Sequence, residues 1–337
     1  MAVSLADVLK DMEKISGKGA VMEGVEVKDI YRIPLPMIAI NRMLYGGIPR
    51  GRMIEFYGPE SSGKTTTALL AVAAYQAQDT RPALFVDAEG TYDPRWAKLL
   101  GVDNSVGRFI KWAPENVNAE EVFQKILDVV ETGEVGMIVL DSIPTLVPMQ
   151  EDEKDMTQKT MGGISAPLTV FARKLQKALL KNDDVVFIGL NQARENMSQY
   201  GPATTTPGGR AWRHMCSVRM EFKSEFADAN GVYLPSGAEN PAGATIIAAL
   251  KKNKTSSGDR RSGRYTVDFK KGFNEKMDVF GVALLTGVIE QRGSSFSYIN
   301  VETGEVIHKA QGKVKFIETM TDDVFEMIKE EVNKNAD

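Results

Sequence analysis

The stretch GPESSGKTT, residues 58–66, decides the fold class because of what flanks it. GRMIEFY before it reads as a buried strand, and TALLAVAAYQAQ after it is rich in strong helix formers. Within it, Gly58-x-x-x-x-Gly63-Lys64-Thr65 is the P-loop pattern in its required context, a strand before and a helix after. Glycines let backbone amides surround a phosphate, and the helix N-terminus adds partial positive charge. The stretch therefore predicts a nucleotide-binding loop.

The predicted site also needs groups for the phosphates and for magnesium. Lys64 would reach the β- and γ-phosphates, and the Thr65 hydroxyl would coordinate Mg²⁺. Asp141 ends the apolar run MIVLDS, where a Walker-B acid holds the magnesium shell. An acid at a strand end is unremarkable alone, but here a P-loop lies upstream at a plausible spacing. The loop residues expected to bind the nucleotide are Gly58, Pro59, Glu60, Ser61, Ser62, Gly63, Lys64, Thr65 and Thr66.

The composition excludes several classes of protein. The chain has 337 residues, 43% of them hydrophobic, which suits one core domain with additions or two domains. Its 41 Lys and Arg against 45 Asp and Glu give a net charge of −4, which argues against coating nucleic acid by global positive charge but allows local basic loops. No run approaches the ~18 apolar residues that span a bilayer, and the acidic N-terminus resembles no signal or transit peptide. We expect a cytoplasmic protein without membrane contact, whose one cysteine, Cys216, is a buried, inert thiol.

Strand-like and helix-like segments alternate between about residues 31 and 270. The apolar runs at 83–89, 136–142 and 184–192 each end in polar residues. Helical patterns lie at 94–100, 118–130 and 166–181. Strands that are apolar throughout and separated by helices are typical of a parallel sheet covered on both faces, with ligands beyond its carboxyl edge. The predicted fold class is α/β, a P-loop NTPase core around a mostly parallel sheet.

Two further segments flank this core. Residues 1–30 are expected to form an N-terminal oligomerisation helix, capped by Ser4, and a linker. A single short helix cannot bury its own apolar face, so it must dock on its own core or on another subunit. The runs SVRMEFK, ATIIAALKK and RYTVDF suggest added strands that complete the core of residues 31–270, and residues 271–337 look like a small α/β domain.

Polar residues at strand ends are candidates for chemistry on the γ-phosphate. Glu89 ends FVDAE beside the P-loop strand and is the preferred general base for the attacking water, with Asp87 as the competing candidate. Gln192 ends the run at 184–192 and could touch the γ-phosphate and the following loop, or could simply cap its strand.

The run YDPRW has two readings. Asp93 followed by Pro94 is a good N-cap and first turn, which would be a purely structural role. Trp96 in that turn could instead stack on a base. Spacing alone does not separate the two readings.

These residues and others resemble one family. The chain contains MEKISGKGAVM, GPESSGKTT, DAEGTYDPRWAKLLGVD and MIVLDS, followed in order by TMGG, NQAR and TTTPGGRAW…SVRMEF, which are similar to motifs of the bacterial RecA recombinases. The resemblance implies that the chain is a phage-encoded relative of this family. The resemblance covers about residues 4–290. It implies a RecA-like core and an ATP-dependent helical filament on single-stranded DNA. Such a filament pairs its strand with a homologous duplex and exchanges strands in recombination and DNA repair.

The resemblance assigns roles within the ATP site. Glu89 looks like the catalytic glutamate of a DNA-dependent ATPase. Asp93 and Trp96 resemble the adenine contacts, and Gln192 resembles the link between the γ-phosphate and a DNA loop. ATP and Mg²⁺ are the cofactors implied.

The run KKNK is similar to a pair of lysines that reach the ATP held by the adjoining subunit, here Lys252 and Lys254. That role is comparable to an arginine finger supplied in trans. Without the family, the run would read as a solvated basic strand end. ATP held between subunits would explain self-association that depends on nucleotide.

The resemblance also implies two DNA-binding loops. The first, about residues 151–163, is acidic at its start, so its methionine and glycines would wedge between bases and offer amides. In the second, about residues 195–209, apolar side chains could enter an opened base step while threonine hydroxyls and glycine amides bind phosphate. A plain solvent loop is the alternative. The residues expected to contact DNA are Met161, Gly162, Gly163, Arg173, Arg194, Met197, Tyr200, Thr204, Thr205, Thr206, Gly208, Gly209, Arg210 and Arg213.

Three positions depart from the family pattern, and all bear on the DNA contacts. Pro207 interrupts the threonine-to-glycine junction, Trp212 replaces a smaller apolar residue, and Ala166 stands where an arginine is expected. A hexameric DNA helicase, built on the same motor fold, is the alternative enzyme. A nucleotide-gated regulator with little hydrolysis is a third reading, although the intact catalytic residues speak against it. Single-strand-binding and mediator proteins are candidate partners.

Overall fold

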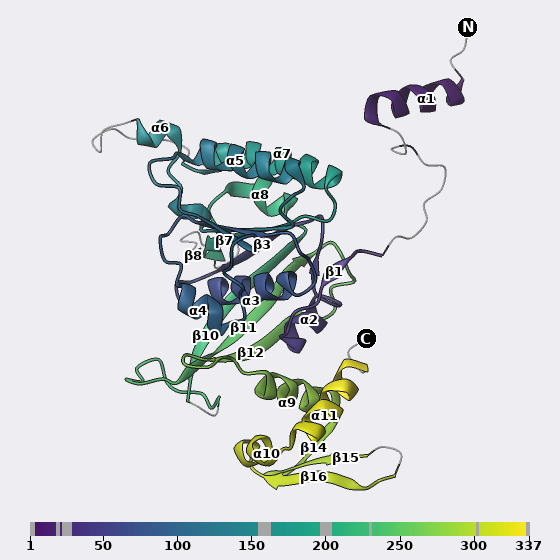
Figure 1. Cartoon of the computed structure of the whole chain (residues 1–337), viewed down its shortest axis with the longest axis vertical. Helices are drawn as coiled ribbons and strands as arrows, with labels where there is room; N and C mark the ends of the chain where they lie inside the picture. Colours follow the sequence, from purple (N-terminus) through teal and green to yellow (C-terminus); the bar gives the residue numbers. More distant parts are fainter. Residues whose placement is uncertain are drawn as a thin grey trace. The chain divides into compact units, whose positions relative to one another are not determined.

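A nine-stranded sheet forms the centre of residues 31–337 (Figure 1). The computed structural model describes residues 4–17, 21, 29–153, 163–195, 204–228, 231–300 and 303–334. From one edge to the other, the sheet runs β13-β12-β11-β10-β3-β7-β6-β4-β5. The bounds of its strands in that order are Gly272–Phe273, Ser262–Asp268, Gly243–Asn253, Val218–Ala227, Met53–Gly58, Val186–Gln192, Met137–Asp141, Ala83–Asp87 and Phe109–Trp112.

The six strands from β10 to β5 pair in parallel, which confirms the predicted sheet. Every residue of β3, β4 and β6 is buried, because helices cover both faces. The three runs predicted as added strands are β10, β11 and β12. β11, β12 and the short β13 extend the sheet in antiparallel fashion.

Helices lie on both faces of the sheet, as the alternating pattern predicts. α3 and α4 lie on one face, below the sheet in Figure 1, and α5, α7 and α8 lie on the other. On the second face Phe123 of α5 stacks on Phe171 of α7, with ring centroids 4.4 Å apart, and Phe171 meets Phe187 of β7 edge-on. The bounds of α3, α4, α5, α7 and α8 are Lys64–Gln76, Pro94–Leu99, Ala119–Thr132, Ser165–Lys181 and Gly209–Met215.

Short elements connect these layers. Strands β1 and β2 pair with each other, as do β8 and β9. The bounds of β1, α2, β2, the 3₁₀ turn, α6, β8 and β9 are Arg32–Ile33, Ile38–Met43, Ile48–Pro49, Ile143–Thr145, Met149–Asp152, Arg194–Glu195 and Thr204–Thr205.

The C-terminal part has a hydrophobic cluster of its own. The rings of Phe280, Phe296 and Phe316 meet one another at centroid distances of 5.2, 5.5 and 6.3 Å. Three antiparallel strands and three helices surround them, as expected for a small α/β unit, while its boundary at residue 270 stays a prediction. The bounds of α9, β14, β15, β16, α10 and α11 are Glu275–Thr286, Ile289–Arg292, Ser295–Ile299, Val306–Gln311, Lys313–Thr319 and Asp322–Lys334.

A buried carboxylate joins this part to the core. The Asp278 side chain, at the start of α9, is 4% exposed, and its Oδ2 accepts a hydrogen bond from the Ile38 amide at 2.6 Å. It therefore caps α2 from another element. Burial raises the pKa of Asp278 to about 7.

Residues 1–30 are a separate unit that contains α1, Leu5–Ser16. The helix begins at the predicted cap, because the Ser4 side chain accepts a hydrogen bond from the Asp7 amide. No residue of α1 is buried, and Leu5 and Ile15 are 73% and 87% exposed. The apolar face thus has no partner within the described residues of this unit.

Candidate nucleotide site

The P-loop connects β3 to α3 in the predicted way. Gly63 precedes the helix with φ +88°, a conformation that favours glycine, and a Cβ there would lie 2.5 Å from Ile246 Cδ1. Lys64 is the first helical residue, and its ammonium donates to the carbonyls of Gly58 and Pro59 at 3.2 and 2.6 Å. Burial lowers the pKa of Lys64, and the nearby carboxylates of Asp141, Glu89 and Glu60 oppose that shift.

Gly58, the first glycine of the loop, is also required by the sheet. A Cβ at this position would lie 2.3 Å from the carbonyl oxygen of Phe222 in β10. That distance is far inside van der Waals contact, and backbone cannot move aside cheaply. The residue therefore lets β10 approach the end of β3.

Thr65 and Asp141, the two predicted magnesium ligands, lie side by side. Thr65 Oγ1 donates to Asp141 Oδ2 at 2.7 Å, which joins α3 to the end of β6. Burial raises the pKa of Asp141 to about 7, and the nearby Glu89 and Asp87 raise it further, while Thr65 and Lys64 lower it. A hydroxyl and a carboxylate suit Mg²⁺, which takes one or two protein oxygens and completes its shell with phosphate and water. Among the described residues no cluster of three His, Cys, Asp or Glu side chains offers a larger metal cage.

Glu89 and Gln192 converge at the carboxyl edge of the sheet, where strands β4 and β7 end. The Ser142 hydroxyl donates to Glu89 Oε1 at 2.5 Å, and Gln192 Nε2 lies 3.5 Å from the same oxygen. Sequence reasoning missed Ser142, although it directly follows Asp141. The Glu89 carboxylate, the expected base, thus lies within reach of Gln192, the expected sensor.

Asp87, the competing base, is committed to other partners. It is 2% exposed, forms an ion pair with Lys111 at 3.0 Å, and accepts from the Thr91 amide at 2.9 Å. It therefore anchors the turn that follows β4. Glu89 lies in that turn with its side chain exposed.

Asp93 has the structural role that its sequence allows. Its side chain accepts from the Arg95 amide at 2.8 Å and caps α4 at Pro94. Trp96 is half-buried and packs against the cluster that contains α3. Its stacking on adenine stays a prediction.

Lys252 and Lys254 lie at the end of β11, against the last turn of α8. Lys252 Nζ donates to the carbonyls of Arg213 and His214 at 2.7 and 2.6 Å, and Lys254 Nζ donates to His214 at 3.0 Å. Burial, with a smaller contribution from the neighbouring Lys254, lowers the pKa of Lys252 to about 8.

The described part of the second loop begins and ends in a two-stranded pairing. Arg194 pairs with Thr205, and Glu195 pairs with Thr204. Gly208 and Gly209 follow with φ +99° and +71°, and α8 begins. Among the predicted DNA contacts, Gly163, Arg173, Arg194 and Arg210 are exposed, Thr205, Gly209 and Arg213 are half-buried, and Thr206 and Gly208 are buried. Met161, Gly162, Met197, Tyr200 and the Thr204 side chain lie outside the described residues.

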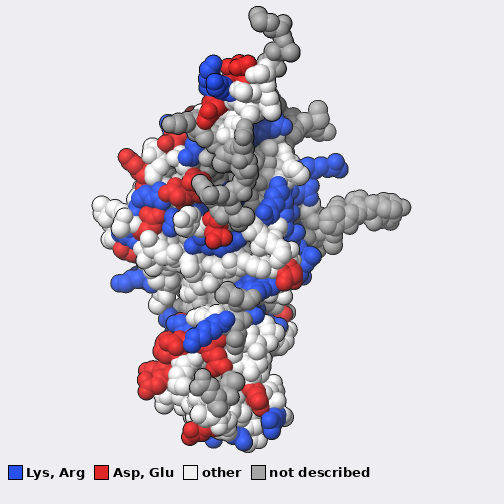
Figure 2. Space-filling view, turned by 90° about the vertical axis from the view of Figure 1, so that its right-hand side faces the viewer, with Lys and Arg blue, Asp and Glu red and all other residues white. Residues whose placement is uncertain are grey.

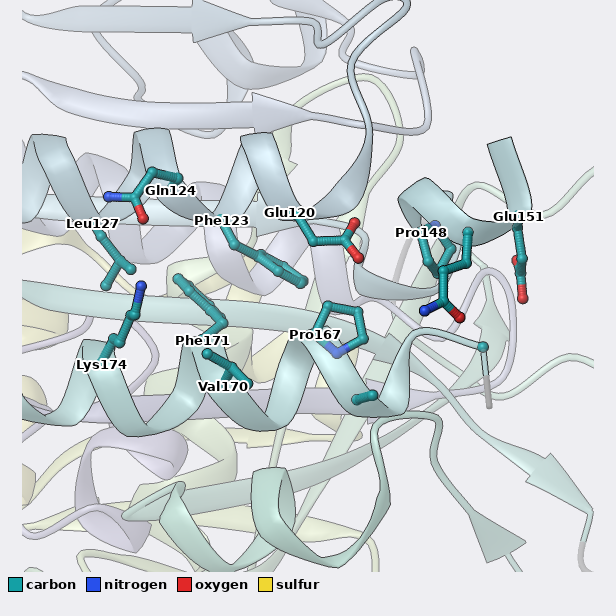
Figure 3. A pocket seen from close by; sticks show the side chains of 13 residues that line it. Glu120, Phe123, Gln124, Leu127, Pro148, Glu151, Pro167, Val170, Phe171 and Lys174 are labelled. Atoms are coloured by element: carbon teal, nitrogen blue, oxygen red, sulfur yellow. The ribbon is translucent and has the colours of Figure 1, made fainter. Parts of the chain in front are cut away.

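A groove of about 420 Å³ lies between α5 and α7, away from the P-loop (Figure 3). Phe123, Phe171 and Pro167 point into it, and Val170, 53% exposed, lies at its rim. Glu120, Glu151 and Lys174 add charge at its borders. No sequence pattern indicated this groove.

The surface charges agree with the balanced composition. Figure 2 shows basic and acidic side chains interspersed over one face rather than a single basic surface. Cys216 is fully buried, as predicted, and burial raises the pKa of its thiol. None of the helices in the described ranges is both long and apolar enough to cross a bilayer.

The sequence matches the family described as the RecA N-terminal domain over residues 3–262. It is 36% identical to Protein RecA of Thermus aquaticus over 99% of this chain and 94% of that protein. It is 32% identical to Protein RecA of Bacillus subtilis, over 97% of this chain and 90% of that protein. A crystal structure of the RadB recombinase aligns with 69% of this chain and 94% of its own, at 18% identity and a TM-score of 0.48.

Proposed function

Because the chain belongs to the RecA family, the recombinases of homologous recombination and DNA repair, we propose that it is an ATPase that forms helical filaments on single-stranded DNA and exchanges strands with a homologous duplex. RecA family proteins are DNA-dependent ATPases that act on DNA as filaments.

The observation that carries the proposal is the convergence of Asp141, Glu89 and Gln192 from three neighbouring strands beside the P-loop. In this arrangement Lys64 and the loop amides would bind the phosphates, and Thr65 and Asp141 would hold Mg²⁺, which would offset charge on the phosphate oxygens. Glu89 takes the proton of the attacking water, and Ser142 fixes the orientation of its carboxylate. Asp93 and Trp96 flank the adenine.

Gln192 is the proposed sensor of the γ-phosphate. Its side chain lies near the base, and its strand continues directly into β8 at the start of the second DNA loop. Gln192 can therefore couple binding of the γ-phosphate to the conformation of the second DNA loop.

Lys252 and Lys254 are proposed to act on the nucleotide of the adjoining subunit. Each is a cation at a strand end, which agrees with a role in neutralising phosphate charge in trans. Filament assembly would then depend on the nucleotide.

We assign the groove between α5 and α7 to α1 of a second copy of this chain. Leu5, Val8, Met12 and Ile15 are all at least 41% exposed and recur at the spacing of a helix that lies in an apolar groove. α1 also carries acidic and basic residues beside this stripe, which suits the mixed charges at the groove borders. A head-to-tail contact of this kind generates a helical filament unless the rotation closes into a ring.

DNA is proposed to bind along the two loops, with Arg173, Arg194, Arg210 and Arg213 supplying local positive charge. Met161, Met197 and Tyr200 would enter base steps, and the threonines and glycines at 204–209 would contact phosphate. Such binding holds the backbone, so its affinity falls with added salt and shows little preference for sequence.

The test is strand exchange between homologous DNAs, together with ATP turnover in the presence and absence of single-stranded DNA. We expect exchange only with ATP and turnover only with DNA. Turnover that ignores DNA would favour a nucleotide-gated regulator. Electron microscopy with a slowly hydrolysed ATP analogue separates the remaining alternative, because a helicase forms closed rings and a recombinase forms long filaments.

A further inference from the structure

Glu55 is a fully buried carboxylate that the ATP site does not use. It lies in β3, three residues before Gly58, and is 0% exposed. Trp212 Nε1 of α8 and Asn191 Nδ2 of β7 donate to its Oε1 at 2.9 and 2.8 Å. Arg219 of β10 forms an ion pair with its Oε2. One side chain thus joins four elements.

Two of these partners extend the network to the second DNA loop. Asn191 Nδ2 also donates to the Pro207 carbonyl at 3.0 Å, and Arg219 Nη2 donates to Thr206 Oγ1 at 3.3 Å. Both acceptors belong to the segment where the loop returns to the core.

Asn191 ties the same network to the sensor. Its Oδ1 accepts from the Gln192 amide at 3.0 Å, so one amide side chain holds both the loop exit and the backbone of Gln192. The Gln192 side chain extends toward Glu89. Two consecutive residues, Asn191 and Gln192, therefore connect Glu55 to the expected base Glu89.

Packing fixes the orientation of Trp212. The residue is fully buried, and its ring meets Phe187 edge-on at 6.3 Å. A Cβ on Gly189 would lie 3.0 Å from Trp212 Cζ2, so the glycine allows the indole to pack closely against the strand. In the observed orientation the indole donates to Glu55.

We propose that Glu55 is a positioning residue that holds the exit of the second DNA loop and the start of α8, residues 206–212, in register with Gln192. This inference rests on the proposed function. A buried ion pair is weak support for stability, because desolvation offsets its attraction. A fully satisfied polar network instead selects one arrangement of the elements that it joins. The role of the network is thus to let DNA bound at the loop act on the γ-phosphate sensor.

Trp212→Phe is the informative variant. Glu55→Gln leaves the Arg219 guanidinium without its counter-charge in the interior, which destabilises the fold itself. Trp212→Phe keeps an aromatic ring and removes one hydrogen-bond donor from Glu55. Phe187→Leu is the matched control, because it reduces packing against the same indole and removes no hydrogen bond.

Two measurements decide the question: ATP turnover with and without oligo-dT at saturating ATP, and amide hydrogen exchange across the folded chain. In Trp212→Phe, we expect the ratio of turnover with DNA to turnover without it to fall about fivefold, as for the loss of one buried hydrogen bond. In the same variant, amide hydrogen exchange should become faster at residues 191–192 and 204–208. In Phe187→Leu the melting temperature should fall while the ratio stays at the wild-type value.

The inference is overturned if Trp212→Phe keeps the wild-type ratio, or if both variants lose it equally. If wild-type ATP turnover does not depend on DNA, the proposed function fails, and only amide hydrogen exchange then tests the role of the network. Faster exchange at residues 191–192 and 204–208 in Trp212→Phe only would then support the positioning role, and equal exchange in both variants would refute it.

Discussion

Lys252 donates its ammonium group to the backbone carbonyl of His214, with 2.6 Å between nitrogen and oxygen. A cation at this place satisfies the last carbonyls of α8, the helix that follows the second DNA loop. If Lys252 turns toward a neighbouring nucleotide, the Arg213 carbonyl loses this donor and the His214 carbonyl keeps only the one from Lys254. The proposed contact between subunits and the end of this helix therefore depend on the same side chain.

A nucleotide shared between subunits predicts rescue in mixtures. Glu89→Gln and the double variant Lys252→Gln/Lys254→Gln should each be inactive alone, because each lacks one half of the site. Random mixing unites an intact Glu89 with intact lysines at about a quarter of the interfaces, so about a quarter of the wild-type turnover should return. The measurement is DNA-dependent ATP turnover of the equimolar mixture.

Lys251→Gln is the control for this experiment. Lys251 is the adjacent lysine, and its ammonium pairs with Glu221 at 2.9 Å. It should retain wild-type turnover. A mixture as inactive as its components would mean that all catalytic groups come from one subunit.

Glu89→Gln should bind ATP and DNA but hydrolyse ATP at least about 100-fold more slowly, because glutamine cannot accept the proton of the attacking water. Single-turnover hydrolysis and filament formation measure the two properties separately. Glu115→Gln, at an exposed position, is the control. Normal turnover in the first variant would remove Glu89 as the base.

Lys64→Ala should abolish assembly that depends on nucleotide, because the loop loses the cation that faces the β- and γ-phosphates. Binding of a fluorescent ATP analogue and electron microscopy provide the measurement. Lys125→Ala removes a lysine that is 68% exposed on α5 and should assemble normally. Filaments of ordinary length from Lys64→Ala would contradict the site assignment.

Val170→Glu should weaken filament assembly about tenfold or more, because it places a charge in the groove proposed to receive α1. The concentration required for assembly, read by light scattering with nucleotide and DNA, tests this. Val106→Glu is the control, since Val106 is fully exposed outside the groove. Equal assembly by both variants would place the α1 contact elsewhere.

The raised pKa of Asp278 predicts that the free energy of unfolding depends on pH. Its pKa is about 7 in the folded chain against an ordinary 3.8, so its favourable contribution is complete below pH 3.8 and is lost as the pH rises through 7. Asp278→Asn keeps an oxygen for the Ile38 amide and cannot ionise. Relative to wild type, the free energy of unfolding of the variant should therefore increase by about 1–3 kcal/mol between pH 5 and pH 9.

Denaturant unfolding at several pH values measures this difference. Asp322→Asn is the control, because that side chain is 92% exposed at the start of α11. Its difference from wild type should hardly change with pH. A flat difference for Asp278→Asn as well would show that this carboxyl titrates normally.

The sequence predicted the features whose signals are local. The P-loop pattern, the apolar runs and the caps at Ser4 and Asp93 depend on neighbouring residues, and the structure contains each of them. That Glu89 and Gln192 lie at one edge also followed, since parallel strands end at one edge. The expected place of the Glu89 strand beside the P-loop strand was wrong, because β7 and β6 lie between β3 and β4.

Features that depend on distant pairing escaped prediction. β5 has only four residues and is half exposed, so it lacks the apolar run that marks its neighbours. Glu55 and Arg219 are 164 residues apart, and although each lies in a run that reads as a strand, nothing in the two runs indicates that they pair. Charged residues inside strands look like surface positions until tertiary packing supplies their partners.

The structural requirement for glycine at position 58 can be mistaken for a role in phosphate binding. Any side chain at this position would push two adjacent strands apart, whatever it did to the nucleotide. A mutational screen for lost activity would rank the residue among the phosphate contacts, although the damage would begin in the scaffold. A variant designed to lose ATP hydrolysis and keep the fold should therefore carry a substitution at Lys64 or Thr65 and retain Gly58.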